Sequence, residues 1–129
     1  MKTTIKITEL THSELSDFLC TALVQSFWAN VDYDVKDKEG LEIPTEYDRP
    51  YFEDVLASLL LNGKTITISD KEDEQEYKLD LKTLLKGFNK VAKSEAYRHH
   101  VWNFITEDYG STDADIILQF AIFGEETYA

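Results

Sequence analysis

The chain has 129 residues, of which 25 are acidic and 13 are basic, and its formal net charge at pH 7 is −12. Apolar residues make up 43% of it, with only two prolines and five glycines. This composition excludes a disordered acidic tail and predicts a single folded domain over residues 1–129. The acidic balance also argues against direct binding of duplex nucleic acid, because phosphates attract basic surfaces.

The sequence shows neither a disulfide pair nor a signal for export or membrane insertion. Cys20 is the single cysteine, which excludes an intramolecular disulfide and a cysteine-based zinc site. Met1-Lys2-Thr3-Thr4 leads into an alternating stretch rather than the apolar core of a signal peptide. The apolar runs are far shorter than the roughly 18 to 20 residues that span a membrane. We therefore expect a cytoplasmic protein without membrane contact.

The first elements in chain order are predicted to be a strand and a helix. Ile5 and Ile7 alternate with polar residues, as in a half-buried strand. Thr11 and Glu14 have the spacing of a capping box, and the apolar residues after them recur at helical intervals. This pattern predicts a helix from about His12 to Trp28.

Residues 30–49 break the periodicity and are expected to be the least regular part of the chain, with one short strand at residues 31–35. Pro50 suits the first turn of a second helix, because its fixed φ fits that position and its missing N–H is not needed there. Asn62-Gly63 is expected to end this helix by allowing left-handed backbone conformations. The face expected to be buried consists of Phe52, Val55, Leu56, Leu59 and Leu60.

An acidic hairpin and a two-faced helix are predicted next. Residues 64–69 and 75–79 alternate as the strands of a hairpin, and residues 70–74 form an acidic tip. Asp80 stands where it can cap a third helix with one apolar side. Four lysines fall within about 80° of one another on the other side of a helical wheel. They are Lys82, Lys86, Lys90 and Lys93.

Two more helices are predicted before the C-terminus. One covers residues 97–106, with Val101, Trp102 and Ile105 sharing a side. The other covers residues 113–123 and is apolar nearly all round. Such a helix is either central to the core or shared with a second subunit in a homodimer.

The order of the elements predicts an α+β domain. Its sheet is expected to be small and antiparallel, to include the hairpin at about residues 64–79, and to be packed by about four to five helices.

The C-terminal segment resembles a known family signature. Residues 113–128, Asp-Ala-Asp-Ile-Ile-Leu-Gln-Phe-Ala-Ile-Phe-Gly-Glu-Glu-Thr-Tyr, resemble the C-terminal block of small acidic proteins encoded by phages, prophages and conjugative elements of gut-associated bacteria. The acidic turn at residues 70–76 and the Leu-x-x-Leu-Leu-Lys-Gly segment at residues 81–87 are similar to that family too. The chain departs from it at Thr127-Tyr128-Ala129, where relatives have an aliphatic residue and a final glycine. The resemblance implies a genetic setting in a bacterial host rather than a mechanism.

Catalytic and metal-binding patterns are not recognisable in the sequence. His99 and His100 are adjacent, and neighbouring helical residues point about 100° apart, so ordinary surface or interface roles are expected. The acidic residues before Gly40 fail the spacing of a calcium-binding loop. Neither a nucleophile elbow nor a phosphate-binding glycine loop is present. We expect no enzymatic activity, no cofactor and no metal.

The charge distribution suggests an acidic interaction protein that docks onto a partner with a basic surface. The resemblance of residues 113–128 implies that this partner is a host protein, such as a defence or nucleic-acid-processing protein, which the chain inhibits or modulates. Residues 32–54 hold nine acidic and three basic side chains, a local net charge of −6. The predicted partner contacts are Asp32, Asp34, Asp37, Glu39, Glu72, Asp73 and Glu74.

The alternative, from a different class, is a binder or sponge of a small anionic ligand such as a signalling nucleotide. Its contacts would be Lys82, Lys86, Lys90 and Arg98. Two plainer readings stand beside these hypotheses, in which the acidity only keeps the chain soluble and the lysines are only the solvated side of a helix.

Overall fold

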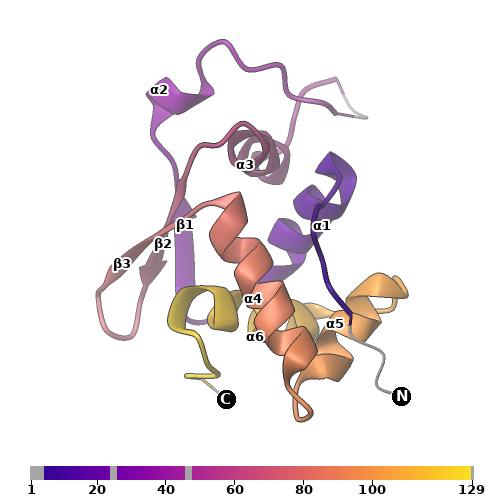
Figure 1. The fold of residues 1–129 in the computed structure, drawn as a ribbon. Coiled ribbons are helices and arrows are strands. Elements are labelled where there is room, and N and C mark those ends of the chain that lie inside the picture. Colours follow the sequence, from indigo (N-terminus) through magenta and orange to yellow (C-terminus); the bar gives the residue numbers. More distant parts are fainter. Residues whose placement is uncertain (1–4, 24–25, 46–47, 129) are drawn as a thin grey trace.

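The computed structural model describes residues 5–23, 26–45 and 48–128 (Figure 1). Across these residues the chain forms six helices and three strands, so the predicted α+β class is confirmed. The one-turn helix α2 brings the helix number above the four to five expected. The elements are α1 (His12–Leu23), β1 (Ala29–Asp32), α2 (Val35–Lys38), α3 (Phe52–Leu61), β2 (Ile66–Asp70), β3 (Glu76–Leu79), α4 (Leu81–Lys93), α5 (Arg98–Ile105) and α6 (Ser111–Phe123).

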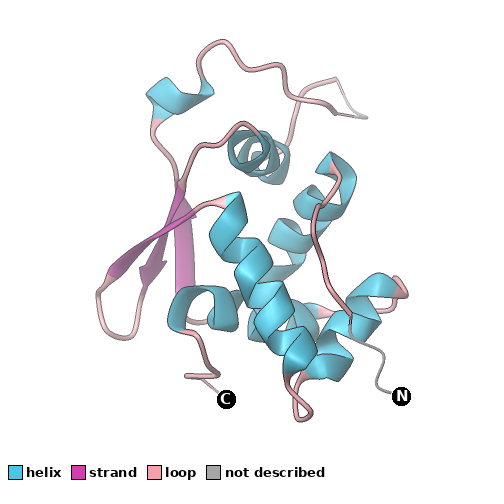
Figure 2. Cartoon of the chain, viewed as in Figure 1, coloured by secondary structure: helices cyan, strands magenta, loops and turns pink. Residues whose placement is uncertain are grey.

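The sheet is antiparallel, in the order β1-β2-β3. Ala29 pairs with Asp70 and Asp32 pairs with Thr67, while Ile66 pairs with Leu79 across the hairpin. Figure 2 shows the sheet at one side of the molecule, with the helices gathered beside it. Alternate residues of β2 are fully buried, as expected for a sheet with one face on the core.

Helix α6 is the centre of the helical part, because α1, α4 and α5 all pack against it. Its residues Ala114 and 116–120 are buried within the single chain. The core position therefore accounts for its apolar surface, and the homodimer stays a prediction. Helix α4 lies close against α6 at Gly87, where an added Cβ would lie 2.6 Å from the Cβ of Ala121.

The predicted N-terminal strand is wrong. The Ile7 N–H donates to Asn89 Oδ1 at 2.7 Å, and Asn89 Nδ2 donates to the Ile7 carbonyl at 2.8 Å. One side chain of α4 thus bonds both backbone groups that a neighbouring strand would have used. Residues 5–11 have no regular structure, although Ile5 and Ile7 pack on the core.

Helix α1 ends at Leu23, before the predicted end at Trp28. Residues 24–25 lie outside the described residues, and residues 26–28 are not helical. The Trp28 side chain is fully buried, and its Nε1 donates to Asp115 Oδ1 at 2.7 Å. Because this contact draws Trp28 towards α6, the residue serves the core from an irregular segment even though its spacing fits the helix.

The hairpin and three helix boundaries follow the prediction closely. Asp80 Oδ1 accepts the Thr83 N–H at 2.7 Å and caps α4. Gly63 and Gly124 have φ angles of +77° and +79°, and they stand at the ends of α3 and α6. The first strand lies at Ala29–Asp32, two residues before its predicted start.

Three large apolar residues that were expected on buried faces are exposed. Phe52 is 48% exposed, in contrast to the rest of its predicted face, which is buried. On α5, Val101 is buried but Trp102 and Ile105 are 55% and 42% exposed. Phe52 stands at the first turn of α3, beyond the part of the helix that reaches the core.

Candidate interaction surface

The acidic residues predicted as partner contacts lie in two groups at opposite ends of the sheet (Figure 1). Asp32 is the last residue of β1, and the other residues of its group follow it into α2. The first residue of β1, Ala29, pairs with Asp70, where the hairpin tip begins. The length of β1 therefore separates the two groups, and they do not form one continuous patch.

The hairpin tip is held by its own carboxylates. Asp70 Oδ1 accepts the Glu72 N–H, and Asp73 Oδ1 accepts the Gln75 N–H, both at 2.9 Å. The other oxygen of Asp70, which is 1% exposed, accepts the Tyr128 hydroxyl at 2.6 Å. Burial opposes ionisation of Asp70, but the hydrogen bonds from Tyr128 and the turn outweigh it and lower its pKa. These two acidic residues thus stabilise the turn, while Glu72 and Glu74 are exposed.

The second acidic group surrounds α2 and adjoins exposed apolar side chains. Val35, Tyr51 and Phe52 are 69%, 51% and 48% exposed. The Tyr33 ring packs on Phe52 with a centroid distance of 5.8 Å, and α2 contacts α3. We call this region the acidic-aromatic surface. It consists of Asp32, Tyr33, Asp34, Val35, Asp37, Glu39, Tyr51 and Phe52.

Two carboxylates of this surface also accept hydrogen bonds from the neighbouring backbone. Asp34 Oδ1 accepts the Lys36 N–H at 3.0 Å and caps α2. Asp32 Oδ1 accepts the N–H of the next residue, Tyr33, at 2.8 Å. Asp37 is half-buried and Glu39 is exposed. All four residues lie at or near the surface, so their charge can act on a partner.

A groove of about 450 Å³ runs between α1 and the start of α3, next to the acidic-aromatic surface. Tyr51 belongs to both. Sequence reasoning missed this groove, because its walls come from segments that are far apart in the chain, residues 12–20 on one side and residues 44–45 and 51–54 on the other. A line of polar residues four apart on α1 was the available signal. The lining consists of His12, Ser13, Ser16, Asp17, Cys20, Pro44, Thr45, Tyr51, Glu53 and Asp54.

The groove contains serine, histidine and aspartate, but they do not form a nucleophile and its base. Ser16 Oγ donates to Asp54 Oδ1 at 3.0 Å, and His12 Nε2 lies 3.2 Å from the Asp54 carbonyl oxygen. A serine nucleophile of the Ser-His-Asp type needs a histidine base within hydrogen-bond reach, and here the Ser16 hydroxyl bonds a carboxylate instead. Burial and the charges of Glu53 and Asp17 raise the pKa of the Cys20 thiol, which disfavours the reactive thiolate.

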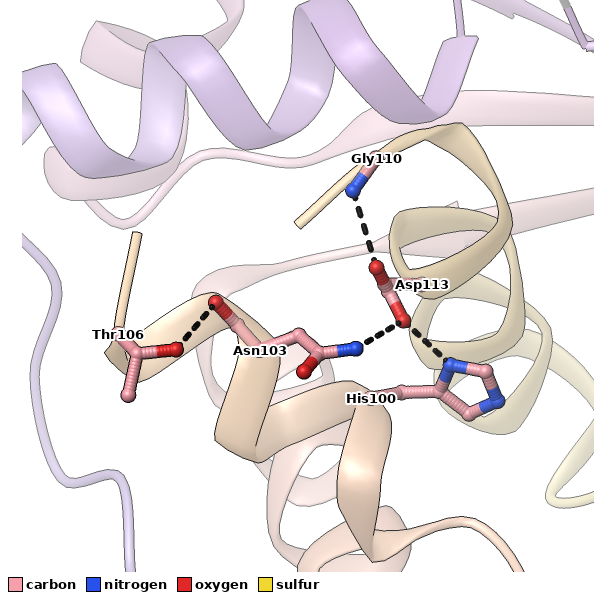
Figure 3. Close-up of polar contacts among 5 residues, drawn as sticks. All are labelled: His100, Asn103, Thr106, Gly110 and Asp113. Atoms are coloured by element: carbon pink, nitrogen blue, oxygen red, sulfur yellow. Dashed lines mark hydrogen bonds and ion pairs between the residues drawn. The ribbon is translucent and has the colours of Figure 1, made fainter. Parts of the chain in front are cut away.

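His100 was expected to be an ordinary surface or interface residue, and this expectation is wrong. It is 8% exposed, and its Nδ1 lies 2.6 Å from Asp113 Oδ1, which also accepts Asn103 Nδ2 at 3.1 Å (Figure 3). The other Asp113 oxygen accepts the Gly110 N–H at 2.9 Å. Burial opposes ionisation of Asp113, but the bonds from Gly110, His100 and Asn103 lower its pKa. This cluster joins α5 to the start of α6. His99 is exposed.

Within residues 5–23, 26–45 and 48–128, no three histidine, cysteine, aspartate or glutamate side chains are grouped so that they could hold a metal ion.

The predicted anion-binding residues lie on an exposed face. Lys82, Lys86, Lys90 and Lys93 project from α4, and Arg98 begins α5. Lys90 Nζ lies so near Gly124 that an added Cβ there would be 3.0 Å away. The ammonium group of Lys90 therefore lies close to the C-terminal end of α6. A cation beside the C-terminal end of a helix is stabilised by the helix carbonyls.

No protein-family model, curated protein or solved structure matches the chain. Among the helices that the structure describes, none has the length and apolar character to cross a lipid bilayer.

Proposed function

We propose that this protein is a non-catalytic interaction protein that docks through its acidic-aromatic surface onto a basic surface of another protein. One observation carries the proposal. Four acidic side chains and the exposed Val35, Tyr51 and Phe52 stand together around α2 and the start of α3. Acidic side chains outnumber the two lysines of α2, Lys36 and Lys38, and exposed aromatic side chains beside such an excess of one charge are typical of protein interfaces rather than of a merely soluble surface.

The two components of the surface would act at different stages of binding. The local net charge of −6 over residues 32–54 attracts a basic partner and raises the association rate, more strongly at low salt. Tyr51 and Phe52 then lose contact with water at the centre of the interface, which slows dissociation. Charge thus selects the class of partner, and the aromatic side chains hold it.

We propose further that the partner is a bacterial host protein, such as a defence or nucleic-acid-processing enzyme, which the acidic surface inhibits or modulates. The resemblance of residues 113–128 to proteins of phages and other mobile elements supports this setting. Enzymes that bind nucleic acid present basic channels, and an acidic protein competes for them. Inhibition by occupation of such a channel requires no catalytic residue.

A second candidate function is the binding of a small anionic ligand, such as a signalling nucleotide, by the lysine face of α4. The exposure of Lys82, Lys86 and Arg98 favours it, and Trp102, 55% exposed on the neighbouring α5, offers an aromatic face for stacking. The position of Lys90 weakens it, because the Nζ of this one of the four proposed ligands lies beside the C-terminal end of α6, whose carbonyl groups attract it.

An affinity pull-down of the tagged full chain from nuclease-treated bacterial lysate tests the proposal, with captured proteins and small molecules identified by mass spectrometry. We expect one stoichiometric basic protein that elutes as salt is raised. Its capture should be lost in a variant with Asp32→Lys, Asp37→Lys and Glu39→Lys, in which Asp34 stays because it caps α2. A bound nucleotide without a protein partner would overturn the proposal in favour of the lysine face.

A further inference from the structure

The groove between α1 and α3 has the size of a binding site. Its volume of about 450 Å³ falls within the roughly 300 to 1,000 Å³ of small-ligand pockets. Helix α1 forms one wall with residues four apart, His12, Ser16 and Cys20, and the first turn of α3 forms the other. The groove therefore has room for one long side chain or one small organic molecule.

Both walls of the groove carry carboxylates. Asp17 comes from α1, and Glu53 and Asp54 come from α3. Asp54 is already bonded through both oxygens, because Oδ1 accepts the Ser16 hydroxyl and Oδ2 accepts the Tyr51 N–H. Asp17 accepts the Tyr109 hydroxyl through one oxygen. The described lining includes no lysine or arginine, so its negative charge is not balanced from within.

The charges of the two walls meet inside the groove. The pKa of the Cys20 thiol is raised by its burial and then by the negative charges of Glu53 and Asp17. The Cys20 side chain thus lies within electrostatic reach of carboxylates from both α3 and α1. A cation placed between these walls would be attracted by both, whereas an anion would be repelled.

A guanidinium group matches this arrangement better than an ammonium group does. Its planar fork of five donors can bond carboxylates on two sides at once, and it sheds water more readily than a compact ammonium. Tyr51 is half-exposed and part of the lining, so the groove also has an aromatic residue in its wall.

We propose that the groove between α1 and α3 binds a guanidinium group, supplied by an arginine side chain of the basic partner. The identity of the source rests on the proposed function, since the groove borders the acidic-aromatic surface through Tyr51. The partner would then be held by one anchored arginine beside a wider charged contact.

The test uses the ¹⁵N-labelled full chain titrated with L-argininamide and followed by NMR. L-Citrullinamide is the matched probe, because an uncharged ureido group replaces the guanidinium while the rest of the molecule is the same. We expect saturable amide shifts at Asp17, Cys20 and Glu53, with citrullinamide roughly tenfold weaker. Glu53→Gln should weaken argininamide binding about threefold or more. Glu95→Gln, an exposed change outside the groove, should leave it unaltered.

The guanidinium site would be overturned by equal shifts with both probes, by shifts outside the groove, or by binding that does not saturate. The comparison of the two probes uses only the original chain, so it does not depend on whether a variant folds. Failure of the site and failure of the proposed function remain distinguishable. If Glu53→Gln still captures a basic protein and argininamide does not bind, the groove is not a guanidinium site, but the proposed interaction surface stands. Argininamide binding without any protein partner removes the arginine side chain as the source.

Discussion

For Gly87 on α4, the sequence and the structure predict opposite effects of an alanine substitution on stability. Replacing a glycine inside a helix by alanine usually stabilises the helix by about 1 kcal/mol. Here an added Cβ would stand 2.6 Å from the Ala121 Cβ and 2.7 Å from its Cα and N. Carbon atoms in good contact are about 3.5 to 4.0 Å apart, so α4 and α6 would have to separate by about 1 Å.

The cost of this separation is expected to exceed the gain in helix propensity. Overpacking typically costs about 1 to 3 kcal/mol, and the upper end applies because the neighbour is helix backbone, which cannot rotate away. Subtracting the propensity gain leaves Gly87→Ala destabilising by about 2 kcal/mol. This should lower the melting temperature by roughly 6 to 10 °C for a domain of this size.

Urea unfolding followed by far-UV circular dichroism measures this change as a shift in the midpoint at constant m-value. Gly110→Ala is the matched control, because a Cβ there meets no atom within 4 Å and its φ is not positive. Because Gly110 is the N-cap of α6 and alanine is a poorer N-cap than glycine, we expect the control to cost at most about 1 kcal/mol, which is less than the cost at Gly87. If Gly87→Ala is as stable as the original chain or more so, the close contact of α4 with α6 is wrong.

Two further predictions concern stability. Glu107 has a φ of +59° just after α5, a left-handed conformation that glycine adopts more easily. Glu107→Gly should therefore raise the free energy of unfolding by about 0.5 to 1 kcal/mol, whereas the neighbouring Asp108→Gly should lower it. The same urea assay measures both changes. The hydrogen bond from the Thr83 N–H and the positive charge of Lys82 lower the pKa of Asp80. Together they outweigh the effect of burial, which raises it. A folded-state pKa below the unfolded value of about 3.9 means that the ionised Asp80 stabilises the fold above that pH and that this contribution is lost as the pH falls through the folded pKa. Asp80→Asn keeps a capping oxygen but removes the charge. At pH 7 the variant should have a lower free energy of unfolding than the original chain, and this difference should shrink towards pH 3. A difference that does not change with pH would contradict this explanation.

Local signals in the sequence predicted the parts of the fold that depend on local chemistry. Asp80, Gly63 and Gly124 act at helix ends as their residue types suggest, because caps and left-handed turns are decided by a few neighbouring residues. The alternation on both sides of the acidic tip likewise predicted the hairpin, since the two strands are adjacent in the chain.

Contacts between distant residues explain the parts that the sequence did not reveal. Ile7 shows the spacing of a strand, but Asn89, 82 residues away, bonds its backbone groups. Trp28 fits the spacing of α1, but Asp115 draws it into the core 87 residues along the chain. Single-sequence periodicity records a side chain's polarity and not its partner, so neither outcome was predictable.

The candidate site was predictable only in part for the same reason. The acidic character of residues 32–39 and 72–74 is visible in the sequence, but their separation by β1 appears only in the strand register. The exposure of Phe52, which helical spacing assigned to the core, gave the acidic surface its aromatic component. The groove depends on α1 and α3 lying side by side, which no local pattern shows.

The most direct test of the acidic-aromatic surface compares two variants of identical net charge for binding to the captured partner. One carries Asp37→Lys and Glu39→Lys beside α2, and the other carries Glu72→Lys and Glu74→Lys at the hairpin tip. Biolayer interferometry at fixed ionic strength measures the association and dissociation rates of each variant. We predict that the α2 variant loses binding roughly tenfold or more while the hairpin variant stays within about twofold of the original chain. Equal loss in both variants would show that overall acidity alone attracts the partner and would contradict the assignment of this surface.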